Sequence, residues 1–246
     1  MKIVVIGGTG LIGSKVVGCL EEEDNEAVAA SPDSGVNTLT GEGLPEVLED
    51  AEAVVDVSNS PSIEDEAAME FFTTSTSNLL AAEAETGVRH HVALSVVGAE
   101  NLPESGYLRA KVAQERLIED GSIPYSIVHA TPFFEFAVRT ADAATDGDTV
   151  RLPHVLFQPM AADDAAAVVC EISQRAPADG VIEIAGPEEF RFDEFIQQAL
   201  KAKGDLRTVV ADPKARYFGA EVEERSLVPT DPAQLGETRF SDWLAR

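Results

Sequence analysis

The sequence predicts an α/β fold built on a doubly wound parallel sheet. Short apolar runs alternate with helical patterns over the first half of the chain, which is typical of parallel strands joined by helices. The length of 246 residues and a hydrophobic content of 44% are enough to bury a sizeable core. After Pro132 the alternation becomes less regular. We therefore expect a main region over residues 1–131 and a smaller region over 132–246, packed together as one compact unit.

The elements of the first half follow from hydrophobic spacing. An apolar run predicts a strand at 2–6, and the spacing of Ile12, Val16 and Leu20 predicts an amphipathic helix over 11–21. The other expected elements are strands at 27–30, 53–57, 91–95 and 125–129, a short helix near 44–49, and helices over 63–85 and 107–119.

The elements expected after Pro132 are shorter and less regular. They are a pair of strands near 149–152 and 155–158, a helix over 163–173, a strand at 181–185 and a helix over 193–201. The segment 212–232 shows little periodicity. We expect this second region to bind and cover a substrate.

A glycine-rich segment, GGTGLIG, joins the first strand to the first helix. We expect Gly7 to permit the tight turn, Gly10 to let the backbone approach a pyrophosphate, and Gly13 to let the helix pack closely on the strand. Free amides and the dipole at a helix N-terminus bind phosphate without a basic side chain. The predicted dinucleotide-binding residues in this segment are Gly7, Thr9, Gly10, Leu11, Ile12 and Gly13. Residues 1–131 are therefore interpreted as a Rossmann-type region.

The GxxGxxG spacing resembles that of the atypical and extended short-chain dehydrogenase/reductase superfamily, and within it the NmrA-like family. Further similarity lies in segments 78–82, 87–95, 125–128, 163–164 and 185–188, so the resemblance covers roughly the first 200 residues. It implies a nicotinamide dinucleotide as cofactor. NmrA-like proteins include both reductases and cofactor-binding regulators that have lost the catalytic groups, so the catalytic residues decide between these functions.

Tyr107 and Lys111 form a YxxxK motif on the helix expected over 107–119. At positions i and i+4 they share one helix face, where the ammonium can lower the pKa of the phenol and reach the nicotinamide ribose. Ser95 ends the preceding strand, where the resemblance implies a hydroxyl that hydrogen-bonds the reacting carbonyl. We expect Ser95, Tyr107 and Lys111 to be catalytic. The alternative is a partly exposed helix pair without a catalytic role.

The chain departs from the pattern of its relatives at two places. Many of them carry an asparagine where this chain has Phe72, so a water relay through that amide is not expected. Where they have Arg-Pro after the substrate-loop strand, this chain has His129, Ala130, Thr131 and Pro132. His129 is interpreted as structural, with substrate contact as the alternative.

The end of the second strand bears on the choice of cofactor. Ser31 and Asp33 lie there without a neighbouring cation, and an acidic side chain repels a 2′-phosphate. Ser31 and Ser34 could still hydrogen-bond a phosphate, and Lys15 is close in sequence. We therefore expect NAD or NADP, with NAD favoured. Ser58 and Asn59 end the third strand and are also expected to line the cofactor site, or else to cap the next helix.

An aromatic cluster follows Pro132. Phe133, Phe134 and Phe136 are the candidate substrate-binding residues, and they suggest a small apolar molecule, including an aromatic or polycyclic one. Burial in the core explains the same phenylalanines equally well.

The strongly acidic composition excludes several classes of partner. With 18 basic and 44 acidic residues the net charge is −26, which repels nucleic acid and anionic membranes. The glycines after Ile6 leave neither a signal peptide nor a membrane span at the N-terminus, so we expect a cytoplasmic protein. The charge fits either a high-salt environment or an ordinary acidic enzyme, which a salt titration of stability distinguishes. The sequence does not predict an oligomeric state.

The two cysteines are expected to be small core residues. Cys19 and Cys170 lie on apolar helical faces with no histidine or further cysteine nearby, so neither a disulfide nor a metal site is predicted.

The sequence therefore predicts an NAD(P)-dependent oxidoreductase that transfers hydride to or from a small apolar carbonyl or alcohol. The alternative is a non-catalytic NmrA-like redox sensor that binds the dinucleotide and a protein partner. A third reading keeps NAD bound for an internal redox or isomerisation step.

Overall fold

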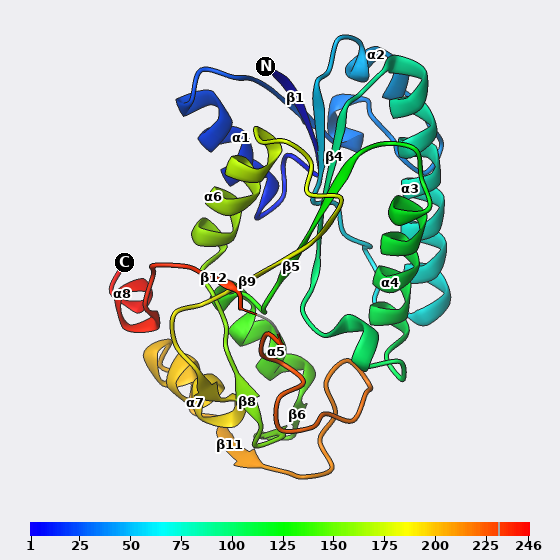
Figure 1. The fold of residues 1–246 in the computed structure, drawn as a ribbon. Helices are drawn as coiled ribbons and strands as arrows, with labels where there is room; N and C mark the ends of the chain where they lie inside the picture. The colour runs from blue at the N-terminus through cyan, green and yellow to red at the C-terminus, as the bar shows by residue number, and fades with distance from the viewer. Residues whose placement is uncertain (231) are drawn as a thin grey trace.

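The computed structural model describes residues 1–230 and 232–246, and its core is a seven-stranded parallel sheet (Figure 1). The strand order is β12-β9-β5-β4-β3-β1-β2. The strands are β1 (Lys2–Ile6), β2 (Glu26–Ala30), β3 (Ala53–Asp56), β4 (His90–Val96), β5 (Tyr125–Ala130), β9 (Gly180–Ala185) and β12 (Gln234–Leu235). Because β2 and β3 lie on opposite sides of β1, the chain changes direction there, and ligands bind such sheets outside the carboxyl ends of the strands at this point.

Helices cover both faces of the sheet (Figure 1). The helices α1 (Gly13–Glu22) and α6 (Ala162–Ser173) pack together on one face, over a core that includes Val5, Val16 and Val169. The other face carries α2 (Leu44–Leu48), α3 (Asp65–Thr86) and α4 (Gly106–Glu119). Among the helices of the described residues, none is both long and apolar enough to span a bilayer.

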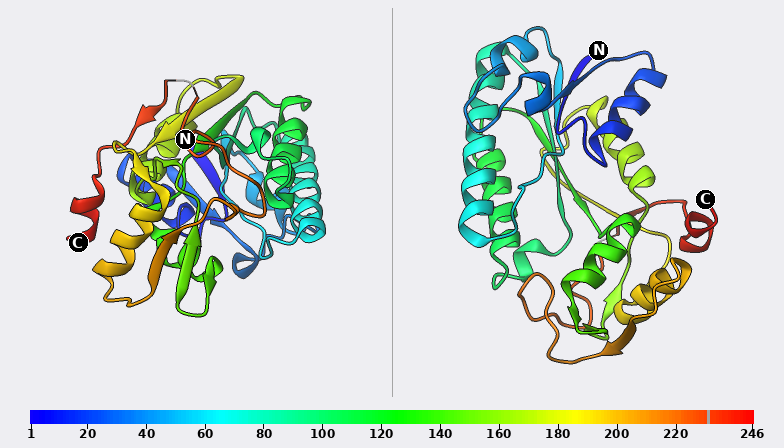
Figure 2. Two further views of the ribbon diagram at one scale, coloured as in Figure 1. Left: turned by 90° about the horizontal axis from the view of Figure 1, so that it is seen from below. Right: turned by 180° about the vertical axis from the view of Figure 1, so that it is seen from behind.

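A smaller C-terminal region lies below the carboxyl ends of the strands in the right-hand view of Figure 2. Its core gathers aromatic side chains, among them Phe134, Phe157, Phe192, Phe195 and Phe240. Its elements are α5 (Ala137–Ala143), β6 (Thr145–Asp146), β7 (Thr149–Leu152), β8 (Leu156–Phe157), β10 (Phe190–Arg191), α7 (Phe192–Ala202), β11 (Thr208–Ala211) and α8 (Phe240–Leu244). Since β9 and β12 extend the main sheet, the second half of the chain also contributes to the first region.

The fold class predicted from the sequence is confirmed, with local corrections. The first helix begins at Gly13 and not at residue 11, because Leu11 and Ile12 belong to the preceding turn. The two strands expected to pair do not pair with each other: β7 pairs with β6 and β11, and β8 pairs with β10. The strand β11 and the helices α5 and α8 were not expected, because their hydrophobic patterns are short.

The expectation that the two cysteines form no disulfide was wrong, whereas their place in the core is confirmed. Cys19 and Cys170 form a disulfide between α1 and α6, with a Cα–Cα distance of 6.4 Å. The two residues are 151 positions apart, so only the packing of α1 against α6 brings them together. Sequence spacing alone carries no signal for such a pair.

Candidate active site

A pocket of about 680 Å³ lies at the carboxyl ends of the strands. Its lining brings together the glycine-rich turn after β1, the residues that follow β2 and β3, and one face of α4. Of the residues predicted to form the site, those that line it are Gly7, Thr9, Gly10, Leu11, Ile12, Ser31, Ser58, Asn59, Ser95, Tyr107, Lys111, Phe133 and Phe136. Residues from distant parts of the chain therefore converge on one cavity.

The glycine-rich turn forms an open backbone cradle at one end of the pocket. Gly7 has a φ of +79°, which favours glycine, and a Cβ there would lie 3.0 Å from the backbone of Ser58. A Cβ at Gly13 would lie only 2.2 Å from the carbonyl oxygen of Gly7, so the helix packs on the turn more closely than any side chain allows. The backbone amides of Thr9, Leu11 and Ile12 have no hydrogen-bond acceptor within the described part of the chain. They are free to bind an anion.

Three buried hydroxyls line the same pocket. Ser31 follows β2, Ser58 follows β3 and Thr131 follows β5, and their side-chain oxygens have no hydrogen-bond partner among residues 1–230 and 232–246. Buried polar groups are normally paired, so these hydroxyls are available to polar groups that enter the cavity. The carboxylate of Asp56 fixes the loop after β3 by accepting the backbone amide of Ser58 at 3.0 Å.

Two charged residues near the cradle, Asp33 and Lys15, do not line the pocket. Asp33 is exposed on the short 3-10 helix Pro32–Ser34 and is not part of the pocket lining, because the turn after β2 directs it to the surface. The ammonium of Lys15 pairs with Asp163 of α6 at 2.5 Å. The end of β2 therefore presents hydroxyls and no cation to the pocket.

Tyr107 lines the pocket from the first turn of α4. Its hydroxyl donates a hydrogen bond to Oδ1 of Asn59 at 2.9 Å, and its ring stacks on Phe218 with centroids 5.4 Å apart. Burial raises the pKa of Tyr107 to about 12, although the charge of Arg139 and the Asn59 hydrogen bond oppose this shift. The expectation of a lowered phenol pKa was therefore wrong.

Lys111 is buried one helical turn further along α4. Its ammonium donates to the carbonyl oxygen of Leu94 at 2.9 Å and to Oε1 of Gln114, and it lies 4.4 Å from the ring centroid of Phe72. These bonds direct the charge toward β4, which explains why it does not lower the phenol pKa. Burial lowers the pKa of Lys111 itself to about 8, against the opposing charges of Asp56 and Glu115.

Ser95 is buried on β4 beside Lys111 and lines the pocket. Its hydroxyl donates a hydrogen bond to Oε1 of Glu115, and the same oxygen lies 3.1 Å from Nε2 of His129. His129 is the direct neighbour of Ser95 in the register of β4 and β5. It contacts Glu115 and does not line the pocket, in agreement with the structural interpretation.

Aromatic side chains form the apolar part of the pocket. Phe133 and Phe136 line it, but Phe134 does not. Phe134 is 1% exposed and packs against Phe195, Phe240 and Trp243 in the C-terminal core, so its predicted substrate contact has to be corrected. The three phenylalanines diverge because a short 3-10 helix, Phe134–Phe136, turns the middle ring inward.

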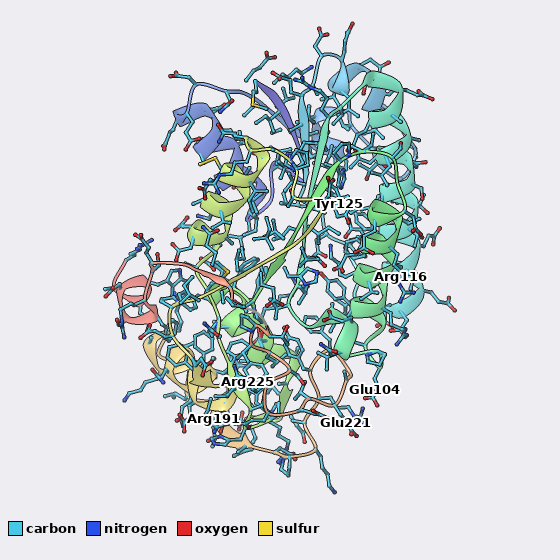
Figure 3. All side chains as sticks on the ribbon, viewed as in Figure 1. Glu104, Arg116, Tyr125, Arg191, Glu221 and Arg225 are labelled. Carbon is cyan, nitrogen blue, oxygen red and sulfur yellow. A yellow bond between two sulfur atoms is a disulfide. The ribbon has the colours of Figure 1, made fainter. Side chains whose placement is uncertain are left out.

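Tyr217 and Phe218 also line the pocket, and sequence reasoning missed them. They belong to the segment without periodicity, and Phe218 has a φ of +47°. The carboxylate of Glu104 holds this segment against the first region, and Figure 3 labels Glu104 and Glu221 close to each other. Glu104, just before α4, accepts the amide of Glu221 at 3.0 Å and the guanidinium of Arg216 at 2.9 Å. No hydrophobic pattern predicts contacts of this kind.

Comparisons with known proteins give a match in structure alone. No protein-family profile and no curated protein matches the chain. Among solved structures, the chain is similar to a Thermus thermophilus UDP-glucose 4-epimerase in complex with NAD, with a TM-score of 0.70, 16% identity and coverage of 92% of each chain. It is also similar to an Escherichia coli NADPH-dependent quinone oxidoreductase complexed with NADPH, with a TM-score of 0.67, 18% identity and coverage of 85% and 77%. A third is a Clostridium acetobutylicum dTDP-4-dehydrorhamnose reductase, with a TM-score of 0.66, 16% identity and coverage of 92% and 91%. At these identities the comparisons establish the fold.

Proposed function

We propose that the protein is an NAD(P)-dependent oxidoreductase of the short-chain dehydrogenase/reductase type, acting on a small apolar carbonyl or alcohol. The observation that carries this proposal is that Ser95, Tyr107 and Lys111 share one pocket with the glycine cradle. The similar structures solved with NAD and NADPH support the choice of cofactor.

The residues of the pocket fit a nicotinamide dinucleotide. The unpaired amides of Thr9, Leu11 and Ile12 would hold its pyrophosphate, and the hydroxyls of Ser31 and Ser58 would bind its polar groups. When bound, the nicotinamide supplies or accepts a hydride. We favour NAD over NADP, because the end of β2 offers no cation and Lys15 is paired with Asp163.

The side chains on the α4 side of the pocket would transfer the proton to or from the substrate oxygen. With a pKa of about 12, Tyr107 keeps its proton through the neutral range and is suited to donating it to a substrate oxygen. Lys111 adds a buried ammonium to the lining of the same pocket. Phe133, Phe136 and Phe218 exclude water and give the pocket an apolar surface, which favours an aromatic or other apolar substrate over a sugar nucleotide.

Binding and turnover test the proposal together. Dissociation constants for NADH and NADPH, measured by nicotinamide fluorescence, are expected to show a preference for NADH, and a tenfold preference for NADPH would overturn that part. Tyr107→Phe is expected to lower kcat on apolar ketones by about 10²- to 10⁴-fold with little change in cofactor affinity. Tyr125→Phe is the matched control, because Tyr125 starts β5 away from the pocket (Figure 3).

The outcomes separate this proposal from its rival. Cofactor binding without turnover on any of a panel of apolar ketones and alcohols would point to a redox sensor. Full turnover in Tyr107→Phe would refute the catalytic assignment.

A further inference from the structure

Glu115 continues the row of functional side chains on α4. It follows Lys111 by four residues, as Lys111 follows Tyr107, so all three lie on one helix face. Its side chain is buried, with the whole residue 8% exposed, and it does not line the pocket. The mechanism proposed above gives no task to Glu115 or to His129. Acidic side chains are rarely buried unless they are paired, so the partners of Glu115 matter.

Glu115 lies between two partners that hold it as a carboxylate. Oε1 accepts the hydrogen bond from Ser95, and Nε2 of His129 lies 3.1 Å from the same oxygen. Burial raises the pKa of Glu115, but His129 in contact with it, the Ser95 hydroxyl and Lys111 together bring it below its ordinary value. The pKa of His129 moves in the opposite direction: burial lowers it, and Glu115 raises it more. Both shifts favour the ionised forms of the pair.

A serine hydroxyl carries a single proton, and an ionised carboxylate can only accept one. Because Ser95 gives its proton to Glu115, the Ser95 oxygen has only lone pairs left for a ligand in the pocket. A ketone oxygen also has only lone pairs. Ser95 therefore cannot polarise a carbonyl while Glu115 holds its proton.

We propose that Glu115, held by His129, is a positioning residue that fixes Ser95 as a hydrogen-bond acceptor, so that the pocket binds its substrate through a hydroxyl group that donates to Ser95. This inference rests on the proposed function. It specifies whether the pocket binds the alcohol or the corresponding carbonyl compound more tightly. An alcohol has a proton to donate to the Ser95 oxygen, whereas a ketone has none. The alcohol is the preferred ligand.

Glu115→Met tests whether Glu115 fixes Ser95 as a hydrogen-bond acceptor, since methionine has nearly the length of glutamate but offers no strong acceptor. The probes are 1-phenylethanol with NADH and acetophenone with NAD⁺, two dead-end combinations that cannot react. Dissociation constants from ligand-observed NMR should show that Glu115→Met shifts the ratio of affinities about fivefold toward the ketone. Glu119→Gln, an exposed acid on the same helix, should leave the ratio unchanged. Equal weakening of both probes, which a purely structural role produces, would overturn the proposal.

A second measurement needs neither cofactor nor substrate. In protein labelled with ¹³C at serine, a buried hydroxyl donating to a carboxylate exchanges slowly with water and gives its own proton resonance. This resonance is expected in the wild type and should be lost in both Ser95→Ala and Glu115→Met. Its absence from the wild type, or its persistence in Glu115→Met, would overturn the assignment of Ser95 as an acceptor. If the protein binds neither NADH nor NADPH, the proposed function fails while this measurement still decides the role of Glu115.

Discussion

The two ends of the pocket are built in different ways. The cradle between β1 and α1 consists of backbone: a glycine with positive φ, a helix packed too closely for a side chain, and unpaired amides. The opposite wall consists of side chains from α4, β4 and β5 whose properties depend on one another. The geometry of the cradle thus changes only when the path of the backbone changes. The chemical properties of the wall change when single side chains are substituted.

The largest effect is expected from closing the cradle. In Gly13→Ala the new Cβ would meet the carbonyl oxygen of Gly7, so the turn or α1 has to move. We expect dinucleotide affinity to fall about 100-fold, because small displacements of a binding group cost that much, and the free energy of unfolding to fall by about 1–3 kcal/mol. Isothermal titration with NADH and denaturant unfolding measure both.

Gly18→Ala is the matched control for this variant. It lies on the same helix, its Cβ would have nothing within 4 Å, and it should gain about 1 kcal/mol in helix propensity. Unchanged cofactor affinity in Gly13→Ala would show that the cradle does not depend on its backbone path.

Removing the buried charge of Lys111 tests the wall of side chains, as Gly13→Ala tests the cradle. Lys111→Met should lower kcat/KM about 100-fold and leave cofactor affinity less affected than Gly13→Ala does. The pKa of Lys111 is about 8 when folded against its ordinary 10.5, so between these values the unfolded chain binds more protons. The wild type should therefore gain about 3 kcal/mol of stability, relative to Lys111→Met, as the pH rises through this window. Parallel stability curves for the two proteins between pH 8 and 10.5 would contradict the buried cation.

The disulfide joins the helix of the cradle to α6, and its loss should weaken the cradle more than the wall. Reduction, or the double change Cys19→Ala and Cys170→Ala, is expected to lower the free energy of unfolding by about 3 kcal/mol. Thiol titration of the native protein and the denaturant midpoint with and without reductant measure this. Two reactive thiols in unreduced, unfolded protein would show that the bond does not form.

The smallest expected effect concerns the aromatic cover of the wall. Phe218→Ala removes the ring stacked on Tyr107 and should weaken binding of an apolar ligand about fivefold, or about 1 kcal/mol. It should also lower the pKa of Tyr107 from about 12 toward 10, because the phenol becomes hydrated. Ultraviolet difference titration measures this shift, with the fully exposed Leu206→Ala as the control. A phenol that titrates as in the wild type would show that burial by Phe218 is not its cause.

The contrast between a cradle of backbone and a wall of side chains also explains which parts of the site could be predicted from the sequence. Glycine spacing after an apolar strand dictates a backbone path, so the cradle and its residues were predicted one by one. The i and i+4 spacing placed Tyr107 and Lys111 on one face, but not the direction of the ammonium, which Leu94 and Gln114 decide. Phe134 was misplaced because three neighbouring rings look alike in sequence. Phe218, the hydrogen bond between Asn59 and Tyr107, and the disulfide depend on contacts between segments far apart in the chain, which no local pattern encodes.

The spacing on α4 has a consequence for how this site can change over time. Tyr107, Lys111 and Glu115 are set one after another at steps of four residues, each advancing about 6 Å along the axis. The three residues share one face of the helix only at this spacing. Adding a single residue between two of them would rotate the later residues by roughly 100° about the helix axis and move them off that face. The chemistry of this site can therefore change by substitution of residues within α4, but an insertion or deletion there would take the site apart.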